Sequence, residues 1–254
     1  MSDRDPSSAS YRDEFAADDL ARQYDAREYG PTSWSTLLWQ LEQRTLDELL
    51  GASTFVPRRE RYLDFACGTG RVLSFVAPHF ETAAGVDIST AMLEQAKARV
   101  PDARLEAADV TATPDVVGGD YDLVTSFRFL LNADARDRVP ALRWMRDRLR
   151  DGSGRVVVNN HSNLWSHKAV THGLRRVRGG GERLTGNVLS HREVQQMVEQ
   201  AGLRVESVHG LGFLGGQALR VIPFGPMARI QEALRQKPLL EKVGEDQIYV
   251  LAPR

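Results

Sequence analysis

Three aspartates stand at the ends of short segments whose apolar residues predict buried strands: Asp64, Asp87 and Asp109. In an open α/β sheet, ligands bind beyond the carboxyl ends of the strands, so we expect these side chains at one rim. An ionised carboxylate accepts hydrogen bonds, and those from hydroxyl groups are short and charge-assisted. The three residues therefore predict a site for a ligand that carries hydroxyl groups or positive charge.

A glycine turn follows the first of these aspartates. Residues 61–73 run from a short apolar strand through Gly68 and Gly70 into an apolar, helix-compatible segment. Glycine has no Cβ, so the turn can adopt unusual φ/ψ values and a ligand can lie against bare backbone. Asp87 lies close to the offset of about 20 residues at which a carboxylate reaches a ribose hydroxyl pair. A turn that only joins the strand to the helix is the alternative.

Residues 64–70, Asp-Phe-Ala-Cys-Gly-Thr-Gly, resemble motif I of the class I S-adenosylmethionine-dependent methyltransferases of the small-molecule type. Dinucleotide-binding folds use a similar glycine pattern, but their third glycine would fall at Leu73, and they have no need of a carboxylate at Asp64. The resemblance implies a doubly wound, mostly parallel, seven-stranded Rossmann-like sheet. It also implies S-adenosyl-L-methionine as the cofactor.

The resemblance assigns roles around the adenosine part of that cofactor. Ile88 and Met92 would flank the adenine, Asp109 would accept from its amino group, and the Val110 N–H would reach a ring nitrogen. Core packing is the alternative for Ile88 and Met92, and turn formation is the alternative for Asp109. The complete predicted cofactor set is Tyr24, Asp64, Ala66, Gly68, Gly70, Asp87, Ile88, Met92, Asp109, Val110 and Phe127.

Two residues are candidates for catalysis. His161 follows the predicted strand at 155–160, and an imidazole with a pKa of about 6.5 can accept a proton at neutral pH. Arg128 follows the fourth predicted strand and is expected to face substrate. A hydrogen bond to its own loop is the alternative for His161, and binding a structural carboxylate is the alternative for Arg128. The predicted substrate residues are Tyr29, Asn132, Asn160 and Trp165.

The predicted organisation has three parts. Residues 1–10 are expected to form a disordered tail, residues 11–56 a helical lid, and residues 57–254 the cofactor-binding domain. Apolar residues recur at three- and four-residue spacing over 34–50, which predicts a helix laid over an edge of the sheet. The basic segment 162–189 predicts a substrate-recognition insertion for an acidic or glycosylated molecule, with an exposed loop as the alternative.

Composition limits the partners. The 254 residues carry 33 Lys and Arg against 34 Asp and Glu, and this balance argues against nucleic acid as the partner. The single cysteine, Cys67, fits a reducing compartment, and its place in the glycine turn favours a small residue over a catalytic thiol. We expect a cytoplasmic protein with no membrane span and no metal site; a homodimer is left open.

The predicted activity is methyl transfer to an oxygen or nitrogen of a small molecule, with a sugar, glycan or natural-product hydroxyl as the first expectation and an amine as the second. A nicotinamide-dependent oxidoreductase on the same fold is one alternative. A non-catalytic nucleoside-binding module is the other.

Overall fold

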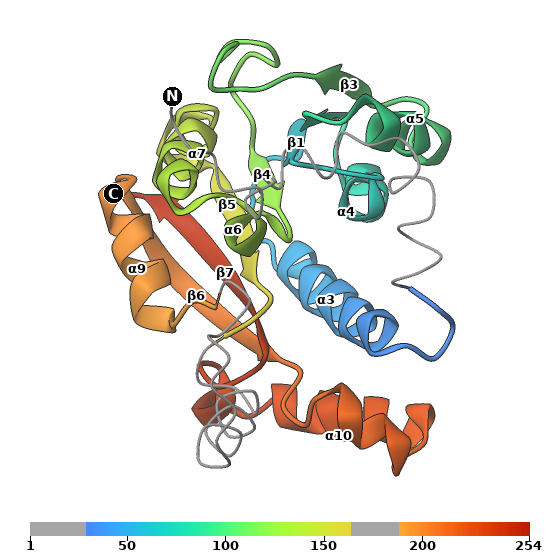
Figure 1. The fold of residues 1–254 in the computed structure, drawn as a ribbon. Helices are drawn as coiled ribbons and strands as arrows, with labels where there is room; N and C mark the ends of the chain where they lie inside the picture. Colours follow the sequence, from blue (N-terminus) through green and yellow to red (C-terminus); the bar gives the residue numbers. More distant parts are fainter. Residues whose placement is uncertain (1–28, 164–187) are drawn as a thin grey trace, which may run out of the picture.

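The computed structural model describes residues 29–163 and 188–254. Within these ranges a single seven-stranded sheet has the strand order β3-β2-β1-β4-β5-β7-β6 (Figure 1). The strands are β1 (Arg61–Phe65), β2 (Thr82–Asp87), β3 (Arg104–Ala107), β4 (Leu123–Ser126), β5 (Arg155–Asn160), β6 (Leu203–Leu211) and β7 (Asp246–Pro253).

The helices of these ranges follow the local sequence signals closely. They are α3 (Trp34–Gly51), α4 (Arg71–Val76), α5 (Thr90–Arg99), α6 (Phe129–Asn132), α7 (Ala135–Asp147), α9 (His191–Gln200) and α10 (Phe224–Arg235). The side chain of Ser89 caps α5, and Ser190 forms a capping box with Glu193 at the start of α9. None of the described helices has the length and apolar character that crossing a membrane requires.

The direction of the strands confirms the predicted doubly wound fold. β1 pairs in parallel with both β2 and β4, β3 extends the sheet beyond β2, and β5 extends it beyond β4. β7 runs antiparallel between β5 and β6, so the sheet is mostly parallel, as the family resemblance implies. The order reverses between β1 and β4, and a crevice for a ligand is expected at such a point.

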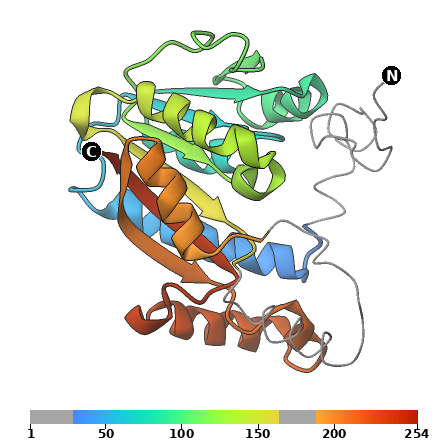
Figure 2. The same cartoon turned by 60° about the vertical axis from the view of Figure 1, so that its left-hand side comes forward.

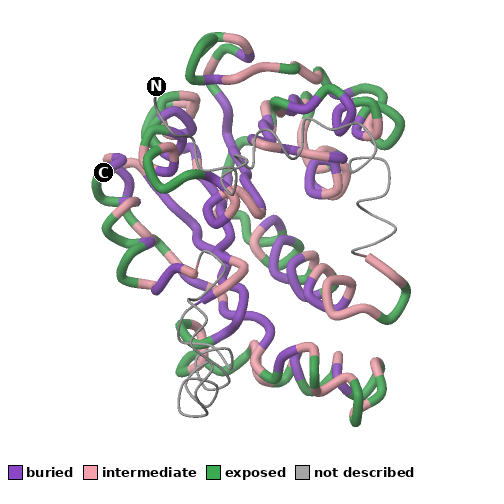
Figure 3. Tube along the Cα trace, in the orientation of Figure 1, coloured by how far each residue is buried: buried purple, intermediate pink, exposed green. Residues whose placement is uncertain are grey.

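One face of the sheet is covered by α7 and α9, which lie on its near side in Figure 2. Val156 and Val158 of β5 belong to the same apolar cluster as Met145 of α7 and Val198 of α9. Val157, between the two valines, belongs to the cluster of the opposite face. The strand is therefore covered on both sides, which explains its continuous apolar sequence (Figure 3).

The opposite face is covered by α3, α4 and α10. Leu37, Leu38 and Leu41 of α3 share a cluster with Tyr62 of β1 and Val250 of β7. The sequence predicts this helix over an edge of the sheet, and its contacts include the edge strand β6. Its apolar stripe also reaches the cluster formed by the inner strands β1 and β7.

The two glycines of the turn, Gly68 and Gly70, have different surroundings and different roles. Both have positive φ, 52° at Gly68 and 77° at Gly70. A Cβ built at Gly68 would meet nothing within 4 Å, whereas one at Gly70 would lie 2.9 Å from the Cβ of Ala96. Gly70 therefore allows the start of α4 to pack closely against α5, and Gly68 leaves an open space beside the backbone.

Gly70→Ala should destabilise the fold more than Gly118→Ala, because Gly118 has a similar φ of 74° but open space around it. Both changes cost about 1–2 kcal/mol for the left-handed backbone. Gly70→Ala adds roughly 1–3 kcal/mol for overpacking against Ala96. Urea unfolding measures the difference, and Ala96→Gly in the Gly70→Ala background should recover part of it. Equal losses at the two glycines would contradict the packing role.

Candidate functional site

A cavity opens at the carboxyl ends of β1, β2 and β4, where the strand order reverses. Asp64, Asp87 and Asp109 all line it, so the three predicted carboxylates meet at one site. Its lining includes twelve of the residues that the sequence singles out: Tyr29, Asp64, Ala66, Gly68, Asp87, Ile88, Met92, Asp109, Val110, Phe127, Arg128 and Asn132.

Three predicted site residues do not line this cavity: Gly70, Asn160 and His161. Asn160 is fully buried, and its amide donates to the carbonyl oxygen of Leu189 at 2.9 Å. His161 is half-buried just after β5, so its role as a base stays a prediction. Tyr24, Trp165 and nearly all of the 162–189 insertion lie outside the described residues.

Asp87 is held in place by backbone donors. Its Oδ2 accepts from the N–H of Gly68 at 2.8 Å, and its Oδ1 accepts from the N–H of Ser89 at 2.9 Å. Burial raises the pKa of Asp87, while these backbone hydrogen bonds favour its charged form. Each oxygen has a second lone pair, so the fixed carboxylate can still accept two hydroxyl donors from a ligand.

Asp64 is the innermost of the three carboxylates and is 2% exposed. The hydroxyl of Thr125 donates to its Oδ1 at 2.6 Å, and the hydroxyl oxygen of Tyr62 lies 2.7 Å from that of Thr125. Thr125 gives its only proton to Asp64, so Tyr62 must donate to Thr125. Burial, partly opposed by the Thr125 hydrogen bond, raises the pKa of Asp64 to about 7.

Asp109 forms a turn and also lines the cavity. Its Oδ1 accepts from the N–H of Thr111 at 2.9 Å and from the Thr111 hydroxyl at 2.6 Å. Apolar surface stands near it: Ile88 is 43% exposed and lines the cavity, and the buried Met92 lies behind. A carboxylate beside apolar side chains suits a flat, weakly polar ring with a donor on its edge.

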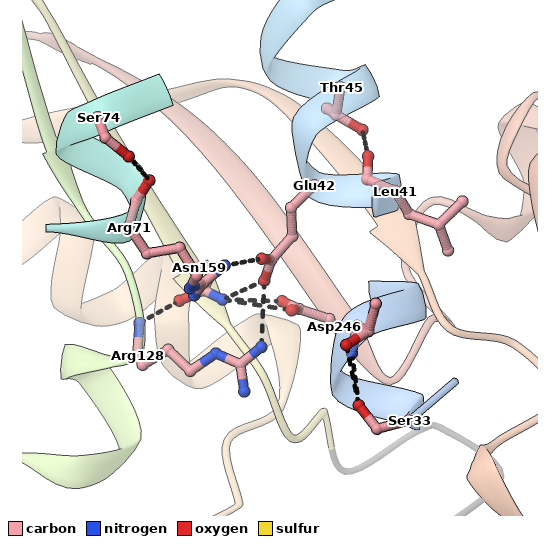
Figure 4. A network of polar contacts seen from close by, with 10 residues as sticks. Ser33, Leu41, Glu42, Thr45, Arg71, Ser74, Arg128, Asn159 and Asp246 are labelled. Carbon is pink, nitrogen blue, oxygen red and sulfur yellow. Dashed lines mark hydrogen bonds and ion pairs between the residues drawn. The ribbon is translucent and has the colours of Figure 1, made fainter. Parts of the chain in front are cut away.

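Glu42 is a buried charged residue, paired with both arginines of the cavity, that sequence reasoning missed. This α3 side chain is fully buried, and it forms ion pairs with Arg71 at 3.1 Å and with Arg128 at 3.5 Å (Figure 4). The side-chain amide of Asn159 donates to Glu42 and to Asp246 of β7. A glutamate on the apolar stripe of a helix was the available signal, because charged residues are rarely buried without partners.

Arg128 has two functions in the structure. Its guanidinium pairs with Glu42, so the alternative that it binds a structural carboxylate is confirmed, yet the side chain also lines the cavity. Its φ is 65°, and its backbone N–H donates to Asn159 at 2.5 Å, which offsets the strain of that conformation. In residues 29–163 and 188–254, no group of three or more His, Cys, Asp or Glu is arranged to hold a metal ion.

Comparison with known proteins agrees with the fold and the motif. Residues 63–152 match a family described as a methyltransferase domain. A demethylmenaquinone methyltransferase from Beutenbergia cavernae is 33% identical over 147 residues. That match spans 57% of this chain and 56% of the relative, so the chain matches about half of the relative's length.

Several solved structures have the same fold at low identity. Magnesium protoporphyrin IX methyltransferase from Synechocystis, with bound S-adenosylhomocysteine, has a TM-score of 0.60 at 14% identity and covers 96% of this chain and 97% of its own. The mitomycin 7-O-methyltransferase has a TM-score of 0.60 at 16% identity, with 97% and 61% covered. A TehB-like methyltransferase from Corynebacterium glutamicum has a TM-score of 0.55 at 18% identity, with 94% and 100% covered.

Asp64→Asn should stabilise the protein most at high pH. In the folded chain, Asp64 keeps its proton up to a pH of about 7, whereas in the unfolded chain it loses the proton near pH 4. The free energy of unfolding therefore falls as the pH rises through this range. The difference in free energy of unfolding between the variant and the wild type should therefore be roughly 2–3 kcal/mol more favourable to the variant at pH 8 than at pH 5. Unfolding at both pH values, with the exposed Asp47→Asn as the control, checks this. A gain that does not change with pH would contradict it.

Proposed function

We propose that the chain is a class I S-adenosylmethionine-dependent methyltransferase and transfers a methyl group from S-adenosyl-L-methionine to a small-molecule acceptor, which the matches to a methyltransferase domain and to a related methyltransferase support. One observation carries the proposal: three carboxylates from successive strand ends line one cavity beside an open glycine turn. Carboxylates in this arrangement suit a nucleoside that also bears positive charge.

The residues present fit this cofactor. Asp87 is oriented by two backbone N–H groups and would accept from the ribose hydroxyls. Asp109 and the N–H of Val110 would bind the edge of the adenine, between Ile88 and Met92. Gly68 leaves room for the ligand against the backbone. These are the roles that the family resemblance implies, and the cavity lining supports them.

When bound, the cofactor supplies a methyl group on a positively charged sulfur. The protein's work is then to hold the acceptor in line and to exclude water. The buried Phe127 and the half-buried Phe129 contribute apolar wall next to Asp64. The pKa of Asp64 is about 7, and a nearby cation would lower it, so Asp64 would be ionised when the ligand is bound. Its negative charge would then stabilise the positively charged part of the ligand.

The acceptor is proposed only as a small molecule with a nucleophilic oxygen or nitrogen. The related proteins are named for demethylmenaquinone, magnesium protoporphyrin IX and mitomycin, which differ widely in chemistry. This variety supports a small-molecule acceptor and singles out none. A sugar or natural-product hydroxyl, an acidic character of the acceptor and a homodimer remain predictions of the sequence.

Asp87→Ala should weaken the binding of S-adenosylhomocysteine by more than tenfold, because the ribose loses a fixed acceptor and the N–H of Gly68 loses its partner. Asp102→Ala, at an exposed turn, should leave the affinity unchanged. Titration calorimetry measures both. An unchanged affinity in Asp87→Ala would remove the role assigned to this carboxylate.

The purified wild type should bind S-adenosylhomocysteine and show no binding of NADH. Incubated with S-adenosylmethionine and a panel of hydroxylated and amino small molecules, it should form S-adenosylhomocysteine only when an acceptor is present. Binding of NADH without S-adenosylhomocysteine would overturn the proposed function in favour of an oxidoreductase. Cofactor binding with no turnover on a broad panel would favour a binding module.

A further inference from the structure

The cavity is lined by cationic as well as acidic side chains. Asp87 and Asp109 stand at the end assigned to the nucleoside, whereas Arg71 and Arg128 are the only cationic side chains that line the cavity in the described residues. Both arginines are mostly buried, with 15% and 18% of their side chains exposed. Two buried guanidinium groups on one cavity wall need compensating negative charge.

Glu42 supplies only part of that charge. It is a single carboxylate, and each of its oxygens faces a different arginine: Oε2 lies 3.1 Å from Arg71 and Oε1 lies 3.5 Å from Arg128. Asp246 stands on the other side of Glu42, fully buried as well, and the amide of Asn159 donates to both acids (Figure 4).

The two buried acids carry one charge between them. Burial raises the pKa of Glu42, but Arg128 and Arg71 outweigh this and hold it below its usual value. Burial and the neighbouring Glu42 raise the pKa of Asp246 well above its usual value. Asp246 is therefore the protonated member, and its proton lies toward Glu42. Within these four groups, the two arginines outnumber the one carboxylate. Asp64, which also interacts with Arg71, has its pKa raised to about 7 by burial.

Aromatic rings fix the direction in which Arg71 can bind. Its guanidinium carbon lies 4.1 Å from the centroid of the Trp39 ring and 4.6 Å from that of Tyr29. These rings cover guanidinium surface in cation–π contacts, so binding of a further anion falls to the in-plane N–H groups. Such a planar donor edge matches the two oxygens of a carboxylate.

We propose that Glu42 is a positioning residue that holds Arg71 and Arg128 as a pair for one ligand carboxylate, with Asp246 as its neutral partner. The ligand group is the carboxylate of the cofactor's amino-acid part, since the proposed cofactor carries one carboxylate and these arginines are the cations that line the cavity within residues 29–163 and 188–254. The inference rests on the proposed function, because it takes S-adenosylmethionine as the ligand.

The two acids should respond differently to removal of charge. Asp246→Asn replaces a neutral acid by an amide of the same shape, which can donate to Glu42 and accept from Asn159. Glu42→Gln alone is a poor test, because Asp246 would then ionise beside Arg128 and replace the lost charge. The informative comparison is therefore Asp246→Asn with the double variant Glu42→Gln/Asp246→Asn.

Comparing the affinities for two ligands distinguishes a loss of arginine positioning from a general loss of folding. S-adenosylhomocysteine carries the amino-acid part, and 5′-methylthioadenosine has the same nucleoside and thioether without it. Asp246→Asn should bind both within about twofold of the wild type. The double variant should lose tenfold or more in affinity for S-adenosylhomocysteine and less than threefold for 5′-methylthioadenosine, by calorimetry on the full chain.

The outcomes are distinct. A loss that is equal for the two ligands in the double variant would mean that Glu42 is only structural, which overturns the inference. A tenfold loss of affinity for S-adenosylhomocysteine in Asp246→Asn alone would mean that Asp246 carries the negative charge, and this would also overturn the inference. A wild type that binds neither ligand would instead overturn the proposed function, so the two failures are told apart.

Discussion

The burial of one negative charge, that of Glu42, organises the walls of the cavity. Its partners come from the start of α4, the turn after β4, β5 and β7, so a single side chain of α3 connects four other parts of the fold. A carboxylate without these partners would be costly to bury, and removing one member of a buried ion pair typically costs about 3–5 kcal/mol. The position of α3 on the sheet is therefore fixed by charge as well as by its leucines.

The cavity offers charged groups of both signs to its proposed ligand. Three of its acids lie at strand ends, and its two arginines lie where α3 meets α4 and the turn after β4. A ligand with hydroxyl groups, a positive sulfur and a carboxylate has a complementary group for each. Because the side chains are already held by protein partners, such as Gly68 for Asp87 and Thr125 for Asp64, little ordering is left for binding to accomplish.

The glycine turn serves packing and binding with different residues. Gly68 leaves the cavity side open, and Gly70 allows α4 to approach Ala96 of α5. The motif alone suggested one shared role for both glycines. Similarly, Arg128 both lines the cavity and pairs with the buried Glu42, so the structural interpretation of the sequence is confirmed and the substrate-facing one stays a prediction.

The strand segments, the glycine turn and the three strand-end aspartates could be predicted from the sequence, because strand ends, caps and turns are set by residues a few positions apart, and the sheet followed from the family resemblance. The position of α3 on the sheet, the contacts of Glu42 and the absence of His161 from the cavity wall became visible only in the folded chain. Glu42 lies 29, 86 and 117 positions from Arg71, Arg128 and Asn159, and no local pattern encodes contacts over such separations. His161 follows β5, one strand beyond the reversal between β1 and β4, and that distance across the sheet is a property of the folded chain alone.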